Sequence, residues 1–230
     1  DFRQHQLSVA EIATAVRRGL DRVEGTRVNL LVDLVRDTGP EWCGRTLEEV
    51  IEVASETGVV GITIGGSEQT YPPGPYAGVY RRAGEAGLGR TVHAGEAGGP
   101  ENVWTALDEL GVDRIGHGVR AVEDPALVRR LVARQVPLEI CPTSNLRTGV
   151  VSSWAEHPVI ELIERGARVT INSDDPTYFE CSLAGELRRV AALTDLDVQR
   201  HTGYAIDASF ADEATKRRLR STLTAWWAER

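Results

Sequence analysis

The stretch Gly89-Arg90-Thr91-Val92-His93-Ala94-Gly95-Glu96 passes from a short apolar run into a histidine and a carboxylate three residues apart. The run at its start predicts a buried strand, and Ala94 and Gly95 are small enough to let another molecule approach the backbone. The same arrangement recurs three times, where apolar runs lead into Gly116-His117-Gly118, Cys141-Pro142-Thr143-Ser144-Asn145 and Asn172-Ser173-Asp174-Asp175-Pro176.

Strands alternate with helices along the chain. Short runs rich in branched residues predict strands at 28–35, 58–65, 89–94, 112–116, 136–141 and 167–172. Amphipathic segments predict helices at 8–23, 46–57, 75–87, 99–111, 122–134 and 157–166. Repeated strand-then-helix units imply parallel strands joined by right-handed crossovers, hence an α/β protein that is either a barrel or an open doubly wound sheet.

Local signals support the helix boundaries. Ser8 with Glu11 and Thr46 with Glu49 form capping-box patterns at two helix starts. Glycines are placed as stops after four of the helices, at Gly58, Gly87, Gly111 and Gly166.

The polar residues at strand ends favour a TIM-type (β/α)8 barrel. A barrel collects the C-terminal ends of its strands around one mouth, whereas a doubly wound sheet spreads them along a crevice. No Gly-x-Gly-x-x-Gly loop or Walker lysine motif follows a predicted strand. Only six strands are found, so we expect residues 1–230 to be one barrel domain that lacks its first one or two strands. The polar residues that follow different strands are Ser67, Glu68, His93, Glu96, His117, Asn145, Asp174 and Asp175.

Composition narrows the possible partners. The 230 residues are 41% hydrophobic and 26% charged, as in an ordinary globular domain. A formal net charge of -8 disfavours nucleic acid and anionic membranes, and no apolar stretch is long enough to cross a bilayer. The three cysteines, Cys43, Cys141 and Cys181, are too far apart for a zinc ribbon and too few for a disulfide scaffold. We therefore expect a cytoplasmic protein.

Four motifs together resemble those of one enzyme family. His-Ala-Gly-Glu at 93–96, Arg-Ile-Gly-His-Gly at 114–118, Cys-Pro-Thr-Ser-Asn at 141–145 and Asn-Ser-Asp-Asp-Pro at 172–176 follow the order found in adenosine/adenine deaminases of the amidohydrolase superfamily, which include 6-aminodeoxyfutalosine deaminases. The resemblance implies a (β/α)8 barrel that carries one zinc ion. It also implies a reaction in which oxygen replaces the 6-amino group of a purine and ammonia is released.

The resemblance also assigns roles to residues of the metal and catalytic site. His93 resembles a histidine ligand of zinc, and Asp174 resembles the aspartate ligand. Glu96 resembles the acid that protonates the purine ring nitrogen, and His117 resembles the base beside the metal. A zinc ion of this kind lowers the pKa of its bound water to roughly 7, and general acid catalysis is typically worth about 10²- to 10⁴-fold.

The substrate contacts are expected in two loops. Gly66 matches the glycine whose backbone N–H meets the purine, and Asp175 matches a substrate contact. Ser67 and Glu68 are further candidates, although Glu68 could instead hold a loop through backbone N–H groups. The Gly65-Gly66-Ser67-Glu68 loop is closer to adenine-type or 6-aminodeoxyfutalosine-type relatives, whereas Arg-Ile-Gly-His-Gly favours nucleosides, so the substrate is left open among them.

Other polar residues have structural interpretations. Cys141 is expected to be a buried small hydrophobe, and Asn145 could organise its loop. His5, His157 and His201 have no acidic partners at strand ends, so we expect them to be structural. Trp226 and Trp227 are typical of packing or of a contact in a homo-oligomer.

One feature of the family is absent. Its first strand carries a His-x-His pair that supplies two zinc ligands, and no His-x-His occurs in this sequence, which also contains no methionine. We expect this segment to precede Asp1 in the native gene. Two other hypotheses stay open: a different metal hydrolase on the same barrel, and a non-catalytic binding protein that keeps the scaffold.

Overall fold

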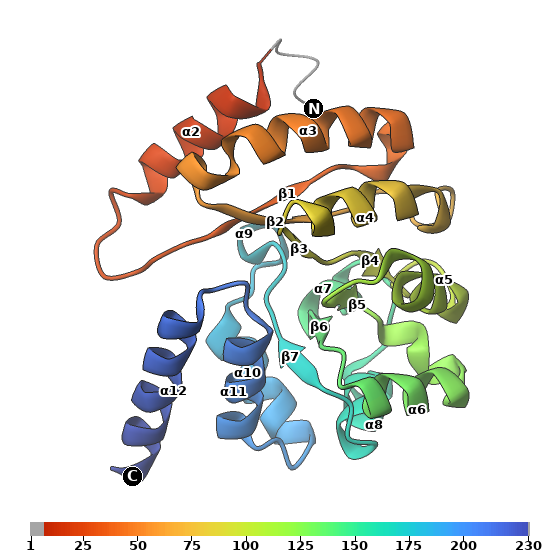
Figure 1. Cartoon of the computed structure of the whole chain (residues 1–230). Helices are drawn as coiled ribbons and strands as arrows, with labels where there is room; N and C mark the ends of the chain where they lie inside the picture. Colours follow the sequence, from red (N-terminus) through yellow and green to blue (C-terminus); the bar gives the residue numbers. More distant parts are fainter. Residues whose placement is uncertain (1–6, 230) are drawn as a thin grey trace.

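A computed structural model describes residues 7–229, which form a parallel α/β fold (Figure 1). All paired strands run parallel, in the orders β1-β2-β3 and β4-β5-β6-β7. The α/β class and all six predicted strand positions are confirmed, with one predicted strand divided into β3 and β4. The strands are β1 Leu30–Asp33, β2 Val59–Thr63, β3 Gly89–Arg90, β4 His93–Ala94, β5 Ile115–His117, β6 Leu138–Ile140 and β7 Val169–Ile171.

Residues 89–94 join the two sheets into one wall. Thr91 and His93 donate their backbone N–H groups to carbonyl oxygens in and just after β2, both at 3.1 Å, and Gly116 in β5 donates to Val92 at 2.8 Å. The strands therefore follow one another in chain order, without the reversal that marks a doubly wound sheet. This is the order of a barrel wall, but β1 and β7 do not pair in the described part of the chain, so the closed barrel is not seen there.

Helices surround this wall, and those between β1 and β7 connect its strands (Figure 1). The helices that the sequence predicted are present with shifted ends, and the 99–111 helix finishes in a π-helical segment, Ala106–Leu110. Those before β7 are α2 Val9–Leu20, α3 Pro40–Thr57, α4 Ala77–Glu85, α5 Pro100–Thr105, α6 Pro125–Arg134, α7 Pro142–Arg147 and α8 Val159–Glu164. Those after β7 are α9 Pro176–Phe179, α10 Leu183–Leu193, α11 Val198–Ala208 and α12 Glu213–Ala228.

The two predicted capping boxes fared differently. The box at Ser8 is present at the start of α2. The box at Thr46 is wrong, because α3 begins at Pro40 and Thr46 lies buried inside the helix. Gly39, with φ 83°, turns the chain into the helix, and proline is favoured at the first helical position because its missing N–H would be unpaired there.

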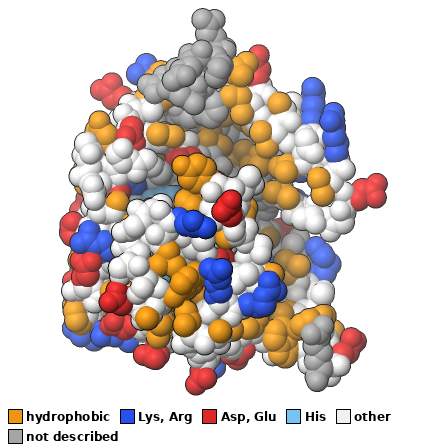
Figure 2. Space-filling view, turned by 180° about the vertical axis from the view of Figure 1, so that it is seen from behind, with side chains coloured by type: hydrophobic (Ala, Val, Ile, Leu, Met, Phe, Trp, Pro, Cys, Tyr) orange, Lys and Arg blue, Asp and Glu red, His pale blue; other side chains and the backbone are white. Residues whose placement is uncertain are grey.

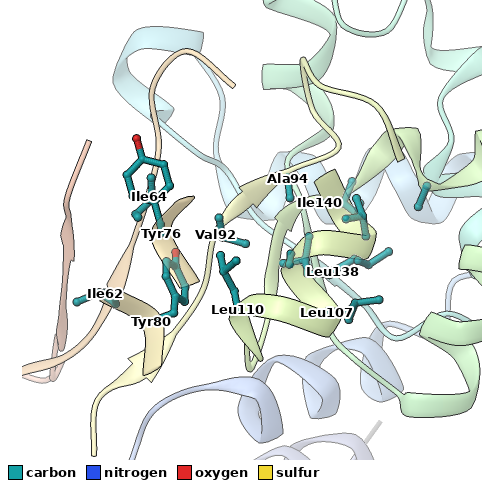
Figure 3. Close-up of a cluster of buried hydrophobic side chains, with 14 of the residues drawn as sticks. Ile62, Ile64, Tyr76, Tyr80, Val92, Ala94, Leu107, Leu110, Leu138 and Ile140 are labelled. Carbon is teal, nitrogen blue, oxygen red and sulfur yellow. The ribbon is translucent and has the colours of Figure 1, made fainter. Parts of the chain in front are cut away.

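The core packs the strands against the helices directly below the strand ends (Figure 3). Ile62 in β2, Val92 beside β4, and Leu138 and Ile140 in β6 are fully buried. Burial of each such side chain is worth about 1.5–3 kcal/mol relative to exposure. The ends of these strands are therefore held at fixed relative positions, which a site built across them requires.

The surface carries charges of both signs. Figure 2 shows acidic and basic side chains interspersed with hydrophobic ones on one face. Among residues 7–229 there is no helix of the length and apolarity needed to span a membrane.

Candidate active site

Five of the polar residues singled out in the sequence meet at the carboxyl ends of the strands. In the parallel pair β4 and β5, Ala94 lies opposite His117, which is the last residue of β5. Glu96 follows β4, Asn145 lies in α7 after β6, and Asp174 follows β7. Because parallel strands bring their ends to one edge, residues from four segments share one site.

Glu96 is the centre of this group. Its Oε2 atom lies 3.5 Å from Nδ1 of His93 and 3.4 Å from Nε2 of His117. The two imidazole centroids are 4.9 Å apart, and Nε2 of His117 lies 3.8 Å from Oδ2 of Asp174. One carboxylate thus contacts two imidazoles, and a second carboxylate approaches the same Nε2 atom of His117.

These donors fit a zinc ion, which takes imidazole nitrogen, carboxylate oxygen and thiolate sulfur. Within residues 7–229, two sets of three have ligand atoms within 4.8 Å of one another: His93 with Glu96 and His117, and His117 with Cys141 and Asp174. The two sets share His117, which therefore lies near both His93 and Asp174. Their joint ligation of one ion stays a prediction.

The charges of the site shift its pKa values in different directions. Burial lowers the pKa of His93, but the adjacent Glu96 outweighs burial, so the pKa is raised above its usual value. Burial raises the pKa of Glu96, but the hydrogen bond to His93 and the charge of His117 outweigh it, so that pKa is lowered. For His117, burial dominates and the pKa is lowered. The site therefore favours an ionised Glu96 between a protonatable His93 and a neutral His117.

Helix α7 supports both His117 and Asp174. Ser144 Oγ donates to Oδ2 of Asp174 at 2.7 Å, and the Asn145 amide lies 3.1 Å from Nδ1 of His117. His117 and Asp174 have φ values of 58° and 54°, a left-handed conformation that is uncommon for residues other than glycine and that clusters at functional sites. Asn145 was expected at the strand ends and as an organiser of its loop, whereas no role was expected for Ser144, although both belong to one strand-end motif.

Glu68 is buried and holds the loop that carries Glu96. Its carboxylate accepts hydrogen bonds from the backbone N–H groups of four consecutive residues, at 2.6 to 3.1 Å, and from the Asn102 amide at 3.0 Å. The four are the residues from Gly95 to Gly98. These bonds match the loop-holding alternative for Glu68 and leave its oxygens engaged within the protein.

The remaining predicted substrate residues lie around the same edge. Ser67 donates its N–H and hydroxyl to the carboxylate of Asp37, at 2.8 and 2.5 Å. Gly66 has φ 94°, and a Cβ atom at that position would lie 2.1 Å from Oδ2 of Asp37, so only glycine fits there. Asp175 is exposed at the start of α9. Their contacts with a substrate stay predictions.

Arg36 was missed by the sequence analysis. It follows the apolar run at the first predicted strand, as the other site residues follow theirs, and it is fully buried. Its guanidinium donates to backbone carbonyls of both site loops, including that of His93. The position of a charged residue at a strand end was the available signal.

Two histidines with structural interpretations, His157 and His201, lie against backbone groups. Nδ1 of His157 accepts from the N–H of Val159 at 3.0 Å, and Nδ1 of His201 lies 2.9 Å from the carbonyl of Val169. Cys141 is buried, and Trp226 packs beside Trp227 with ring centroids 4.7 Å apart. His5 lies outside the described residues.

Comparison with known proteins places the chain in one enzyme family. The Adenosine deaminase family model matches residues 2–226, so the chain belongs to the adenosine deaminase family. It is 41% identical over 202 residues to the adenine deaminase of Sinorhizobium fredii, covering 86% of this chain and 62% of that protein. It is 39% identical over 222 residues to the aminodeoxyfutalosine deaminase of Streptomyces avermitilis, covering 92% of this chain and 61% of that protein.

A solved structure with zinc is also similar. The crystal structure of an amidohydrolase from Burkhoderia ambifaria, with bound Zn, superposes with a TM-score of 0.91 at 27% identity, over 99% of this chain and 65% of that one. The chain thus spans slightly less than two thirds of the length of these proteins.

Proposed function

We propose that the full-length protein is a zinc-dependent hydrolytic deaminase that converts a 6-aminopurine, free or as a nucleoside, to the 6-oxo product and ammonia. The observation that carries this proposal is the Glu96 carboxylate in contact with the His93 and His117 imidazoles, with the Asp174 carboxylate near the same Nε2 atom of His117. Adenine deaminase and aminodeoxyfutalosine deaminase relatives support the substrate class.

In this proposal His93 and Asp174 hold the metal, and the zinc-bound relative supports its identity. When bound, zinc would act as a Lewis acid that lowers the pKa of a coordinated water toward about 7. Ser144 keeps the Asp174 carboxylate oriented through its 2.7 Å hydrogen bond. Such supporting bonds fix the direction in which a ligand presents its lone pairs.

Glu96 and His117 move the protons. Addition of oxygen to the amino-bearing carbon is slow unless the adjacent ring nitrogen is protonated, and Glu96 is assigned that proton delivery. Because its pKa is lowered, Glu96 is ionised at rest and must first take a proton. His117 is the assigned source of that proton, because its Nε2 lies 3.4 Å from Oε2 of Glu96. His117 has by then accepted a proton from the attacking water. The remaining proton of the added hydroxyl group then passes to the amino group, the C–N bond breaks, and ammonia leaves as the 6-oxo group forms.

The substrate is proposed to lie against the Gly66 backbone N–H, with Asp175 and Ser67 at its rim. Adenine, adenosine and 6-aminodeoxyfutalosine are the candidates. We propose that the protein has no nucleic-acid or membrane partner. We also propose a cytoplasmic location, since Cys43, Cys141 and Cys181 are all free, and a homo-oligomer whose interface includes the C-terminal tryptophans.

The test is ammonia release by the full-length protein. Each of the three candidates is incubated with zinc-loaded protein, and zinc is counted per chain. We expect one zinc ion and ammonia from at least one candidate. Stoichiometric zinc without ammonia from any of them would favour a different hydrolase on this scaffold, and absence of zinc would favour a binding protein.

A further inference from the structure

Arg36 is a buried cation without a carboxylate partner. It lies in the 3-10 turn Arg36–Thr38 that follows β1, and its side chain has no exposed surface. Among the residues that the structure describes, none forms an ion pair with it. An ionised group taken out of water is costly unless its donors are satisfied, so the four carbonyl groups around Arg36 must fill that need.

Three of those carbonyls belong to the loop after β2, and the fourth is that of His93 in β4. The guanidinium donates to Gly65 from Nε at 3.1 Å, to Tyr71 from Nη1 at 3.0 Å, and to Ile64 from Nη2 at 3.0 Å. Nη2 also donates to the carbonyl of His93 at 2.5 Å. One side chain therefore ties the loop after β2 to the end of β4.

These bonds fix more than the carbonyl oxygens. In a trans peptide the C=O and the following N–H lie in one plane and point in opposite directions. When Arg36 binds the Gly65 carbonyl, it therefore aims the Gly66 N–H away from itself, and the backbone N–H of Arg36 reinforces this by donating to the same oxygen at 3.0 Å. The bond to His93 likewise fixes the backbone from which its imidazole projects.

We propose that Arg36 is a positioning residue. It holds the purine-binding N–H of Gly66 and the metal-binding imidazole of His93 at fixed positions relative to each other. This inference rests on the proposed function for the purine contact, whereas its metal part requires only a zinc site. Arg36 touches neither ligand and acts through the two loops.

Lysine cannot replace this group. Its ammonium has three donors on a single nitrogen, whereas the planar guanidinium has five donors spread over three nitrogens, as four carbonyls in different directions require. Arg36→Lys keeps the positive charge and removes the geometry. Arg17→Lys is the matched control, because Arg17 donates to the Val28 carbonyl at 2.7 Å and contacts neither loop.

The experiment measures binding in the full-length protein, with zinc and with hypoxanthine, the 6-oxopurine, as separate probes. We expect Arg36→Lys to weaken zinc binding about 10- to 100-fold, the usual cost of losing a group that orients a ligand, and to weaken hypoxanthine binding about 10-fold or more. Arg17→Lys should leave both constants unchanged. If Arg36→Lys bound either zinc or hypoxanthine with the wild-type dissociation constant, the proposal that Arg36 positions both groups would be overturned.

A second variant covers the case in which Arg36→Lys does not fold. The Tyr76 hydroxyl donates to the backbone carbonyl of Arg36 at 2.5 Å, so Tyr76→Phe loosens Arg36 without removing it. We expect a smaller loss in both arms, about threefold, from one hydrogen bond. Unchanged constants would overturn the proposal. If the wild type does not bind hypoxanthine, the free base is excluded as a ligand and the zinc arm alone decides the role of Arg36, whereas the proposed function is tested separately by ammonia release.

Discussion

Replacing Glu68 by glutamine should destabilise the loop that carries Glu96. The Glu68 carboxylate is 3% exposed and accepts five hydrogen bonds. Its Oε1 atom accepts from the Gly95 N–H and the Asn102 amide, and its Oε2 atom accepts from the next three backbone N–H groups. Glutamine has the same shape but places an NH₂ group, a donor, at one of these two positions.

The size of the effect depends on which position the NH₂ group takes, because Oε1 accepts from two donors and Oε2 from three. Each buried donor that loses its acceptor costs about 1–3 kcal/mol. The bonds from Glu96 and Ala97 are only partly buried, so water can replace part of what they lose, whereas the bond from Gly98 is buried. We therefore expect a loss near the lower end of the sum for two or three donors, about 2–3 kcal/mol in the free energy of unfolding.

Urea unfolding of the full-length protein measures this loss. Glu101→Gln is the matched control, because Glu101 is exposed and accepts one backbone N–H, from Gly99 at 3.2 Å. It should change the free energy of unfolding by less than about 1 kcal/mol. Turnover should fall in Glu68→Gln as Glu96 loses its position. Equal stability of Glu68→Gln and Glu101→Gln would refute the reasoning.

Three further predictions concern the site and its surroundings. Glu96→Gln should lower turnover of the preferred aminopurine by about 10²- to 10⁴-fold with zinc binding nearly unchanged, because the amide has no proton to give; wild-type turnover would contradict the mechanism. Chelation of zinc should lower the melting temperature and abolish ammonia release, and added zinc should restore both, because a ligand that binds the folded state stabilises it; a melting temperature insensitive to zinc would count against the metal site. Burial lowers the pKa of His157 to about 4, so the unfolded chain binds this proton at a higher pH than the folded protein. About 3 kcal/mol of stability that is present above pH 6.5 should therefore be lost as the pH falls to 4. His157→Asn keeps an acceptor for the Val159 N–H without titrating, and its unfolding free energy should lack this loss; parallel pH profiles of variant and wild type would show that His157 is not its source.

The strand positions and the grouping of the site residues could be predicted from the sequence because they depend on local patterns. An apolar run followed by His93 or Asp174 marks both a buried strand and a polar group at its end. Parallel strands then bring those ends to one edge whatever the details of packing. The start of α3 at Pro40 was missed, although Cys43, Leu47 and Val50 have the helical spacing of a buried face.

The polar contacts that hold the site could not be predicted in this way, because each partner is distant in sequence. Glu68 meets the loop after β4 across 27 to 30 residues, and Arg36 reaches the His93 carbonyl across 57. Neither partner is a charged side chain that composition would pair with it; both contacts are made with backbone groups, which every residue carries. The sequence by itself therefore determined which polar residues follow the strands and meet at one edge, and only the tertiary structure decided which charged side chains hold them in place.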